Sequence, residues 1–153
     1  MNIHTNSDNY NYSSIKDSLP EAWERLEHLH ENKGELRGVP TGFRDLDQYL
    51  SGLQKSDLII LAARPSMGKT TLALDIARQT ALQNNIPTVI FSLEMSTQQL
   101  VDRMLAAQSR VNAWNLRTGN LSAEDEFSKI RDSLDLLSRA PIFVDDLAGN
   151  SIM

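Results

Sequence analysis

The sequence predicts an α/β fold in which a parallel β-sheet is covered by helices on both faces. Three short apolar runs have the length of buried strands: residues 58–62, 88–93 and 142–144. Periodic apolar residues predict helices over residues 70–84, 97–107 and 122–138, and a shorter one from Phe43 to about Gly52. Continuous apolar strands that alternate with helices are typical of parallel sheets buried between two helical layers.

The bulk composition narrows the possible functions. The chain has 153 residues, the length of one domain, and its 41% of apolar residues can form a core. It has no cysteine, which excludes disulfides and thiolate metal sites, and its three histidines are scattered. The net charge of −5 argues against a surface that coats nucleic acid. With neither a signal peptide nor a membrane span of about 20 apolar residues, we expect a cytoplasmic protein without membrane contact.

The N-terminal part is predicted to contain a tail and one helix. Residues 1–13 are polar and aperiodic, so we expect a disordered tail. Residues 14–34 predict a helix, in which Ser18-Leu19-Pro20-Glu21 has the form of a capping box with proline in the first turn. Its end is expected at Asn32-Lys33-Gly34. The third segment, residues 35–153, is then the α/β domain.

The predicted N-terminal helix has one apolar stripe, formed mainly by Leu19, Trp23 and Leu26. Two interpretations are open. The stripe either packs on the helix's own domain or belongs to a linker helix that docks on a neighbouring subunit. The helix lies between a polar tail and the helix-breaking residues 38–42, and this position motivates the second interpretation.

A phosphate-binding loop is predicted between the first apolar run and the next helix. Residues 63–70 fit the template G-x-x-x-x-G-K-[ST], with Ala63 in place of the first glycine, whose dihedral freedom alanine lacks. Backbone N–H groups of such a loop and of the helix N-terminus converge on phosphate. Gly68 permits close approach, Lys69 reaches the β- and γ-oxygens, and the Thr70 hydroxyl is a Mg²⁺ ligand. The predicted ATP-binding residues are Ala63, Arg64, Pro65, Ser66, Met67, Gly68, Lys69, Thr70 and Thr71.

A candidate general base follows the second apolar run, in the segment Ser92-Leu93-Glu94-Met95-Ser96. Functional groups of a parallel sheet gather beyond the C-terminal ends of its strands. Glu94 would therefore face the phosphate loop, where a carboxylate can polarise an attacking water. The alternative is that Glu94 only caps the next helix, and on spacing alone both interpretations stay open.

These motifs resemble, in combination, those of replicative DNA helicases of the DnaB family. The resemblance runs from about Ser14 to Met153 and rests on four segments: Ala62 to Thr71, Gly38 to Phe43 with Leu46-Asp47, Phe91 to Ser96, and Leu116-Arg117-Thr118-Gly119. It implies a RecA-like P-loop ATPase domain, with ATP and Mg²⁺ as cofactors and Lys69 as a catalytic residue. It also implies that Glu94 activates the water that attacks the γ-phosphate.

The same resemblance implies a homo-hexameric ring that encircles and unwinds DNA, with single-stranded DNA as a partner. The linker helix would pack on the adjacent subunit through Leu19, Trp23 and Leu26. Primase and the helicase loader are partners of the family's N-terminal helical domain, to which nothing in this sequence corresponds.

We expect the RecA-like domain to be incomplete. By the family's order, the Walker B strand, the DNA-binding loops and the arginine finger lie beyond Met153. The segment Ile142 to Asp146 has the look of a Walker B strand but corresponds to the preceding strand, which leaves the roles of Asp145 and Asp146 open. The strand at residues 58–62 would lack a neighbour on one side, so we expect the 153-residue chain alone to be poorly stable and to hydrolyse ATP negligibly.

Two alternatives to a helicase fragment remain. One is a RecA- or RadA-type recombination ATPase or a KaiC-type clock ATPase, which shares the T-G-x-x-x-L-D segment that ends at Asp47; the Arg64-Pro65-Ser66-Met67 sequence favours the helicase. The other is a truncated, non-catalytic chain that binds nucleotide or joins intact subunits through its N-terminal helix.

Overall fold

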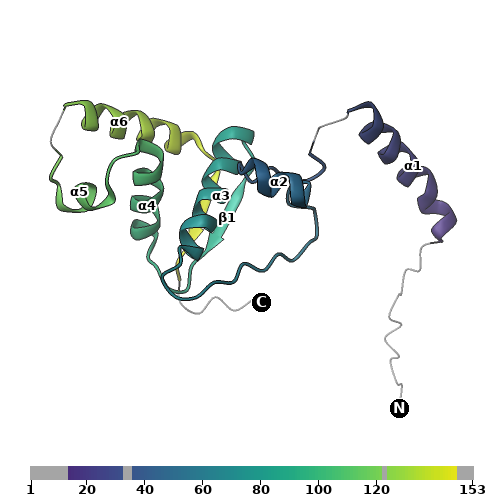
Figure 1. Cartoon of the computed structure of the whole chain (residues 1–153), viewed down its shortest axis with the longest axis horizontal. Helices are drawn as coiled ribbons and strands as arrows, with labels where there is room; N and C mark the ends of the chain where they lie inside the picture. The colour runs from purple at the N-terminus through teal and green to yellow at the C-terminus, as the bar shows by residue number, and fades with distance from the viewer. Residues whose placement is uncertain (1–13, 33–35, 122–123, 148–153) are drawn as a thin grey trace, which may run out of the picture. The chain divides into compact units, whose positions relative to one another are not determined.

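The computed structural model of the chain describes residues 14–32, 36–121 and 124–147. The chain divides into two compact units, Met1–Arg37 and Gly38–Met153, here called unit 1 and unit 2. Figure 1 shows the elements of each unit. The predicted disordered tail, the helix end at Lys33-Gly34 and the cap at Ser122-Ala123 lie outside the described residues. No helix of the described part is long and apolar enough to cross a membrane.

The described part of unit 1 contains the helix α1, Ile15–Glu31, as the sequence predicts. Its N-cap is Ser14, so the predicted capping box of Ser18 to Glu21 does not form and Pro20 lies beyond the first turn. The additional turn before Ser18 places Ile15 on the apolar stripe, one helical turn before Leu19. Its cost is one intrahelical hydrogen bond, because Pro20 has no N–H to donate.

The apolar stripe of α1 is exposed along its length. Trp23 is 63% exposed, with Leu19 and Leu26 similar, and no residue of α1 is buried. The Trp23 indole N–H donates a hydrogen bond to Glu27 Oε1, 2.7 Å away on the next turn. A single helix has no second layer against which it can bury its own stripe.

Unit 2 has the predicted alternation of helices and parallel strands. Its elements are α2 (Arg44–Leu50), α3 (Lys69–Asn84), β1 (Thr88–Phe91), α4 (Thr97–Ser109), α5 (Ala113–Thr118), α6 (Glu124–Arg139) and β2 (Ile142–Asp145). β1 and β2 form a parallel pair in which Thr88 lies opposite Ile142 and Phe91 opposite Asp145. The parallel sheet is therefore confirmed, and α5 is a helix that the periodicity had not indicated.

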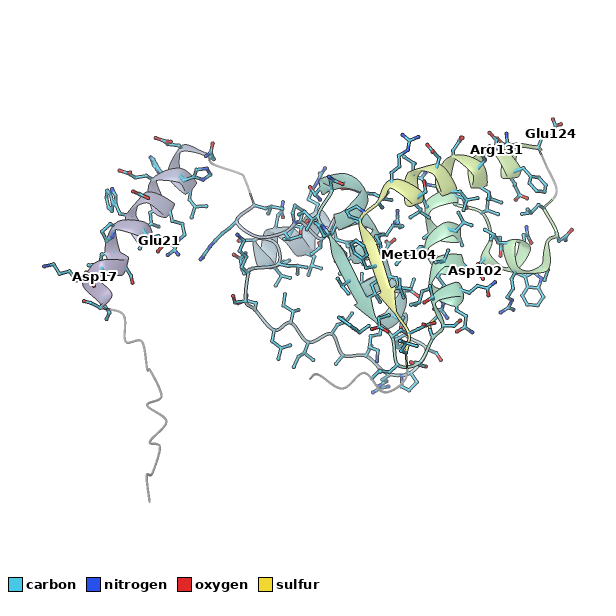
Figure 2. All side chains as sticks on the ribbon, turned by 180° about the vertical axis from the view of Figure 1, so that it is seen from behind. Asp17, Glu21, Asp102, Met104, Glu124 and Arg131 are labelled. Atoms are coloured by element: carbon cyan, nitrogen blue, oxygen red, sulfur yellow. The ribbon has the colours of Figure 1, made fainter. Side chains whose placement is uncertain are left out.

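The core lies between the sheet and the helices that pack on one of its faces. Leu74 of α3 and Leu100 and Met104 of α4 form the buried cluster. Ile90 of β1 and Val144 of β2 pack against it from the sheet. Figure 2 shows Met104 on the sheet side of α4 and Asp102 on the opposite side. The apolar stripe of α4 therefore faces the core, as its spacing predicts.

The opposite face of the sheet is exposed. Side chains alternate along a strand, so Val89, Phe91 and Phe143 point away from the core cluster. Phe91 is 72% exposed, and Val89 and Phe143 are each more than half exposed. In the described residues this face of the sheet is therefore largely exposed.

The apolar run at residues 58–62 is not a strand, so this sequence prediction is wrong for the structure of this chain. The segment has no regular structure, and Leu58 is 87% exposed. A strand exists only through hydrogen bonds to a neighbour. Among the described residues β1 pairs with β2, and no strand pairs with residues 58–62. Residues 58–62 have the composition of a strand, but the described residues offer them no neighbouring strand with which to form hydrogen bonds.

A buried hydrogen-bonded clasp joins the start of unit 2 to α3. The backbone N–H and the hydroxyl of Thr41 both donate to Asp47 Oδ1, at 2.8 Å each. The Thr80 hydroxyl of α3 donates to the carbonyl of Pro40 at 2.9 Å. Next to this, Val39 and Leu53 form an antiparallel bridge. The T-G-x-x-x-L-D segment therefore has a structural role, because its first and last residues, Thr41 and Asp47, form the buried hydrogen bonds.

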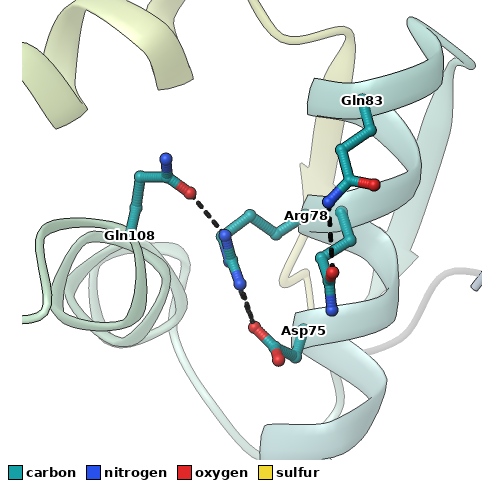
Figure 3. A network of polar contacts seen from close by, with 5 residues as sticks. Asp75, Arg78, Gln83 and Gln108 are labelled. Carbon is teal, nitrogen blue, oxygen red and sulfur yellow. Dashed lines mark hydrogen bonds and ion pairs between the residues drawn. The ribbon is translucent and has the colours of Figure 1, made fainter. Parts of the chain in front are cut away.

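A polar network joins α3 to α4 (Figure 3). The Arg78 guanidinium contacts Asp75 on its own helix and Gln108 in the last turn of α4. Its Nε lies 3.1 Å from Asp75 Oδ1. Because Arg78 is mostly buried, these contacts are screened less than surface ion pairs. They fix the C-terminal end of α4 against the helix that follows the phosphate loop.

The clasp predicts the effect of Asp47→Ala. The substitution removes the acceptor of two hydrogen bonds from Thr41, a fully buried residue, and so leaves buried donors unsatisfied. We expect the free energy of unfolding of the chain to fall by about 2 kcal/mol, measured by urea denaturation. The control is Asp45→Ala, an exposed aspartate of the same helix. Equal effects of the two substitutions would contradict the structural role of Asp47.

Candidate phosphate-binding site

The predicted phosphate loop leads directly into α3. Two of its residues have left-handed backbone conformations, Ser66 with φ of 64° and Gly68 with φ of 81°. The Met67 N–H donates to the Arg64 carbonyl at 3.3 Å and closes a turn between them. Left-handed residues alternating with right-handed ones turn backbone N–H groups toward a common concavity that suits an anion. Ala63 has no positive φ, so alanine replaces the template's first glycine without strain.

The N-terminus of α3 is open in front of Gly68. The first intrahelical bond runs from Leu72 N–H to the Gly68 carbonyl, at 2.9 Å. The N–H groups of residues 68–71 thus lie outside the helix's own ladder and carry the positive end of its dipole. A Cβ placed on Gly68 would meet no atom within 4 Å. Lys69 is exposed and Thr70 half-buried at this end, so the site has donors, a cation and a hydroxyl together.

Glu94 lies in a tight turn after β1. The Ser92 N–H donates to the Asp145 carbonyl at 2.8 Å, which continues the ladder one residue past the strand. The Ser92 hydroxyl accepts from Met95 N–H at 3.0 Å and donates to the Met95 carbonyl at 2.6 Å. Met95 packs against the core cluster, while Glu94 is exposed. The turn is therefore fixed, and its carboxylate is free to face solvent or ligand.

Glu94 does not cap α4, so the alternative interpretation of this residue is wrong. The N-cap is Ser96, whose side chain accepts from Gln99 N–H at 3.4 Å. Gln99 Oε1 accepts in return from Ser96 N–H at 3.2 Å, which completes a capping box. The spacing S-x-x-Q is a sequence signature of this box, and it could have identified the cap before the structure did.

The phosphate loop and Glu94 lie at the same end of unit 2. Figure 1 shows that the segment entering α3, the C-terminal ends of both strands and the start of α4 meet there. Within the described residues, no hydrogen bond or ion pair joins Glu94 to residues 63–71. The two predicted parts of the site therefore lie at one end of the fold with no hydrogen bond or ion pair between them in the described residues.

The two aspartates at the C-terminal end of β2, Asp145 in the strand and Asp146 after it, accept hydrogen bonds from backbone N–H groups. Asp146 Oδ2 accepts from Thr97 N–H, at the first residue of α4, over 2.6 Å. The bonds from the Thr97 backbone and side chain favour the charged carboxylate and hold the pKa of Asp146 below its ordinary value. Asp145 Oδ1 accepts from Leu147 N–H at 3.1 Å. The described residues contain no cluster of three or more histidine, aspartate or glutamate side chains suited to a metal ion.

Comparison with known sequences places these features in a family. Residues 38–153 match the DnaB-like helicase C terminal domain. The chain is 52% identical over 135 residues to the replicative DNA helicase DnaB of Geobacillus stearothermophilus. It is 48% identical over 138 residues to the replicative DNA helicase DnaC of Bacillus subtilis. These alignments cover 88% and 90% of the chain but 30% of each relative.

Solved structures have the same fold. The "ATPase Domain of G40P" superimposes with a TM-score of 0.83 at 30% identity, over 92% of this chain and 49% of that one. A DnaB-like replicative helicase, whose structure was described together with its interactions with primase, superimposes with a TM-score of 0.77 at 30% identity, over 92% of this chain and 33% of that one. The expected RecA-like α/β fold is confirmed. The chain belongs to the family of DnaB-like helicase C-terminal domains and spans about a third of its relatives' length.

Proposed function

We propose that this chain forms the nucleotide-binding part of a replicative helicase that uses ATP hydrolysis to unwind DNA. The observation that carries the proposal is the open N-terminus of α3, preceded by a left-handed Gly68 and followed by Lys69 and Thr70. Its membership in the DnaB-like family supports the helicase over a recombination or clock ATPase.

The residues present fit the phosphates of ATP. The N–H groups at the start of α3 would donate to β-phosphate oxygens, with residues 63–67 wrapping the rest of the group. The Lys69 ammonium would neutralise charge on the β- and γ-oxygens. The Thr70 hydroxyl supplies an oxygen ligand of the kind that Mg²⁺ prefers, and Mg²⁺ when bound provides further positive charge at these oxygens.

Glu94 is our candidate for the general base. Its carboxylate is exposed on a turn that Ser92 and Ser96 fix from both sides. It lies at the end of unit 2 that carries the phosphate loop. A carboxylate in this place can orient a water and accept its proton during attack on the γ-phosphate.

The further partners follow from the family and from α1. We propose that the chain works within a homo-hexamer on single-stranded DNA in the cytoplasm, with primase and a loader as partners of the complete protein. Leu19, Trp23 and Leu26 form an exposed apolar stripe. Burial of such a stripe against another protein surface is favourable, which supports a linker helix that docks on the adjacent subunit.

A second candidate is a non-catalytic fragment that binds nucleotide or joins intact rings. The exposed residues 58–61 and the two-stranded sheet favour it, because hydrolysis needs groups held more firmly than binding does. The two candidates share the phosphate site and differ in turnover.

Lys69→Ala tests the phosphate site in the 153-residue chain. A charge-assisted contact to phosphate is worth about 2 kcal/mol, so we expect ATP affinity to fall roughly 30-fold. Titration with a fluorescent ATP analogue measures this, and Lys55→Ala, an exposed lysine outside the loop, is the control. Unchanged affinity for the Lys69 variant would show that the phosphate assignment is wrong.

Glu94→Gln tests the base in a full-length helicase that contains this chain. Glutamine keeps the size of the side chain but cannot accept the proton, so we expect ATP binding to be retained and kcat to fall by about 10²- to 10⁴-fold. Steady-state ATPase assays with DNA present give kcat. Turnover equal to that of the unsubstituted helicase would refute the role of Glu94.

A further inference from the structure

The turn that carries Glu94 is tied to the end of β2 on both sides. On one side the Ser92 N–H donates to the Asp145 carbonyl at 2.8 Å, as a continuation of the ladder. On the other side the Thr97 N–H donates to Asp146 Oδ2 at 2.6 Å. Glu94 lies between these two hydrogen bonds, so Asp145 and Asp146 at the end of β2 fix both ends of its turn.

Met95 packs against the core cluster, and further hydrogen bonds lie within the turn or within α4. The Ser92 hydroxyl closes on Met95, and the capping box joins Ser96 to Gln99. They define the shape of the turn but not where α4 begins relative to the sheet. The side chain of Asp146 accepts the hydrogen bond that joins the first residue of α4 to the end of β2.

Asp146 is chemically suited to this task. Its carboxylate meets the N-terminal end of a 13-residue helix, where a negative charge is favoured by the helix dipole. The lowered pKa keeps it charged at neutral pH. At its other end α4 is joined to α3 through Gln108 and Arg78, so the helix is held near both termini.

We propose that Asp146 is a positioning residue for Glu94. By holding the first turn of α4 at the end of β2, it sets where the Glu94 carboxylate lies relative to the phosphate loop at the N-terminus of α3. The inference rests on the proposed role of Glu94 as the base. It gives a function to an aspartate whose sequence context resembles a Walker B strand. Displacement of a reacting group by about 1 Å can cost up to about 100-fold in rate, so a single tether at this point matters for hydrolysis.

Asp146→Ala in the full-length helicase removes the tether. We expect kcat for ATP hydrolysis to fall about tenfold while the Kd for ATP changes less than about twofold, because the phosphate loop is untouched. Asp146→Asn keeps an oxygen that can accept from Thr97, so it should retain kcat within about threefold. Asp102→Ala, an exposed aspartate on the same helix, is the control and should leave both constants unchanged.

Thr97→Pro breaks the same contact from the donor side. Thr97 is the first residue of α4, where proline is tolerated, and Ser96 before it has φ of −69° and ψ of 155°, which proline permits. This variant leaves Asp146 in place and removes the Thr97 N–H, from which the Asp146 carboxylate accepts its hydrogen bond. We expect the same loss of kcat as for Asp146→Ala, and normal kcat in Thr97→Pro would overturn the proposal even if Asp146→Ala fails to fold.

A double-mutant cycle separates positioning from general stability. If Asp146 acts through Glu94, Asp146→Ala should change kcat less than about twofold in a Glu94→Gln background. An equal tenfold loss in both backgrounds would overturn the proposal. If Glu94→Gln alone leaves turnover unchanged, the proposed base is wrong. If Glu94→Gln slows turnover but Asp146→Ala and Thr97→Pro do not, only the positioning role fails.

Discussion

The parallel hydrogen-bond ladder between β1 and β2 determines where the functional side chains of unit 2 lie. It brings together segments that are far apart in the chain, with Phe91 opposite Asp145 in the last register position. Because parallel strands end at the same edge, the turn with Glu94 is a neighbour of Asp145 and Asp146 at the end of β2. Burial of Ile90 and Val144 against Leu74 and Leu100 stabilises this ladder from one face.

The predictable parts of the fold are those whose signals are local. Helical spacing located α3, α4 and α6, and the loop motif located Gly68, Lys69 and Thr70, since each signal lies within a few neighbouring residues. The prediction of a strand at residues 58–62 was wrong because an apolar pattern shows only that a strand is possible. Whether a neighbouring strand is present to pair with it is not encoded in that pattern. The contact between Asp146 and Thr97 spans 49 positions and depends on strand register, which periodicity does not encode.

The exposed apolar surface of unit 2 is a consequence of the same ladder. Phe91 and Phe143 lie on the uncovered face, and Leu58 to Leu61 have no strand beside them. Exposed apolar faces and unpaired edges favour association with other chains. The chain spans about 30% of the two relatives named above, and in its described residues β1 and β2 form a two-stranded sheet. The folded unit is therefore held by one face of the sheet and by polar contacts such as the Thr41–Asp47 clasp.

Binding and hydrolysis depend on different kinds of structure in this chain. The proposed phosphate site needs the loop and one helix end, so local sequence is enough to build it. In the proposed function, hydrolysis also needs Glu94 at a defined distance from that loop, and this distance depends on β1, β2 and the start of α4 together. On this proposal, loosening of the sheet affects turnover before it affects nucleotide affinity. We therefore expect the isolated chain to bind nucleotide with little turnover.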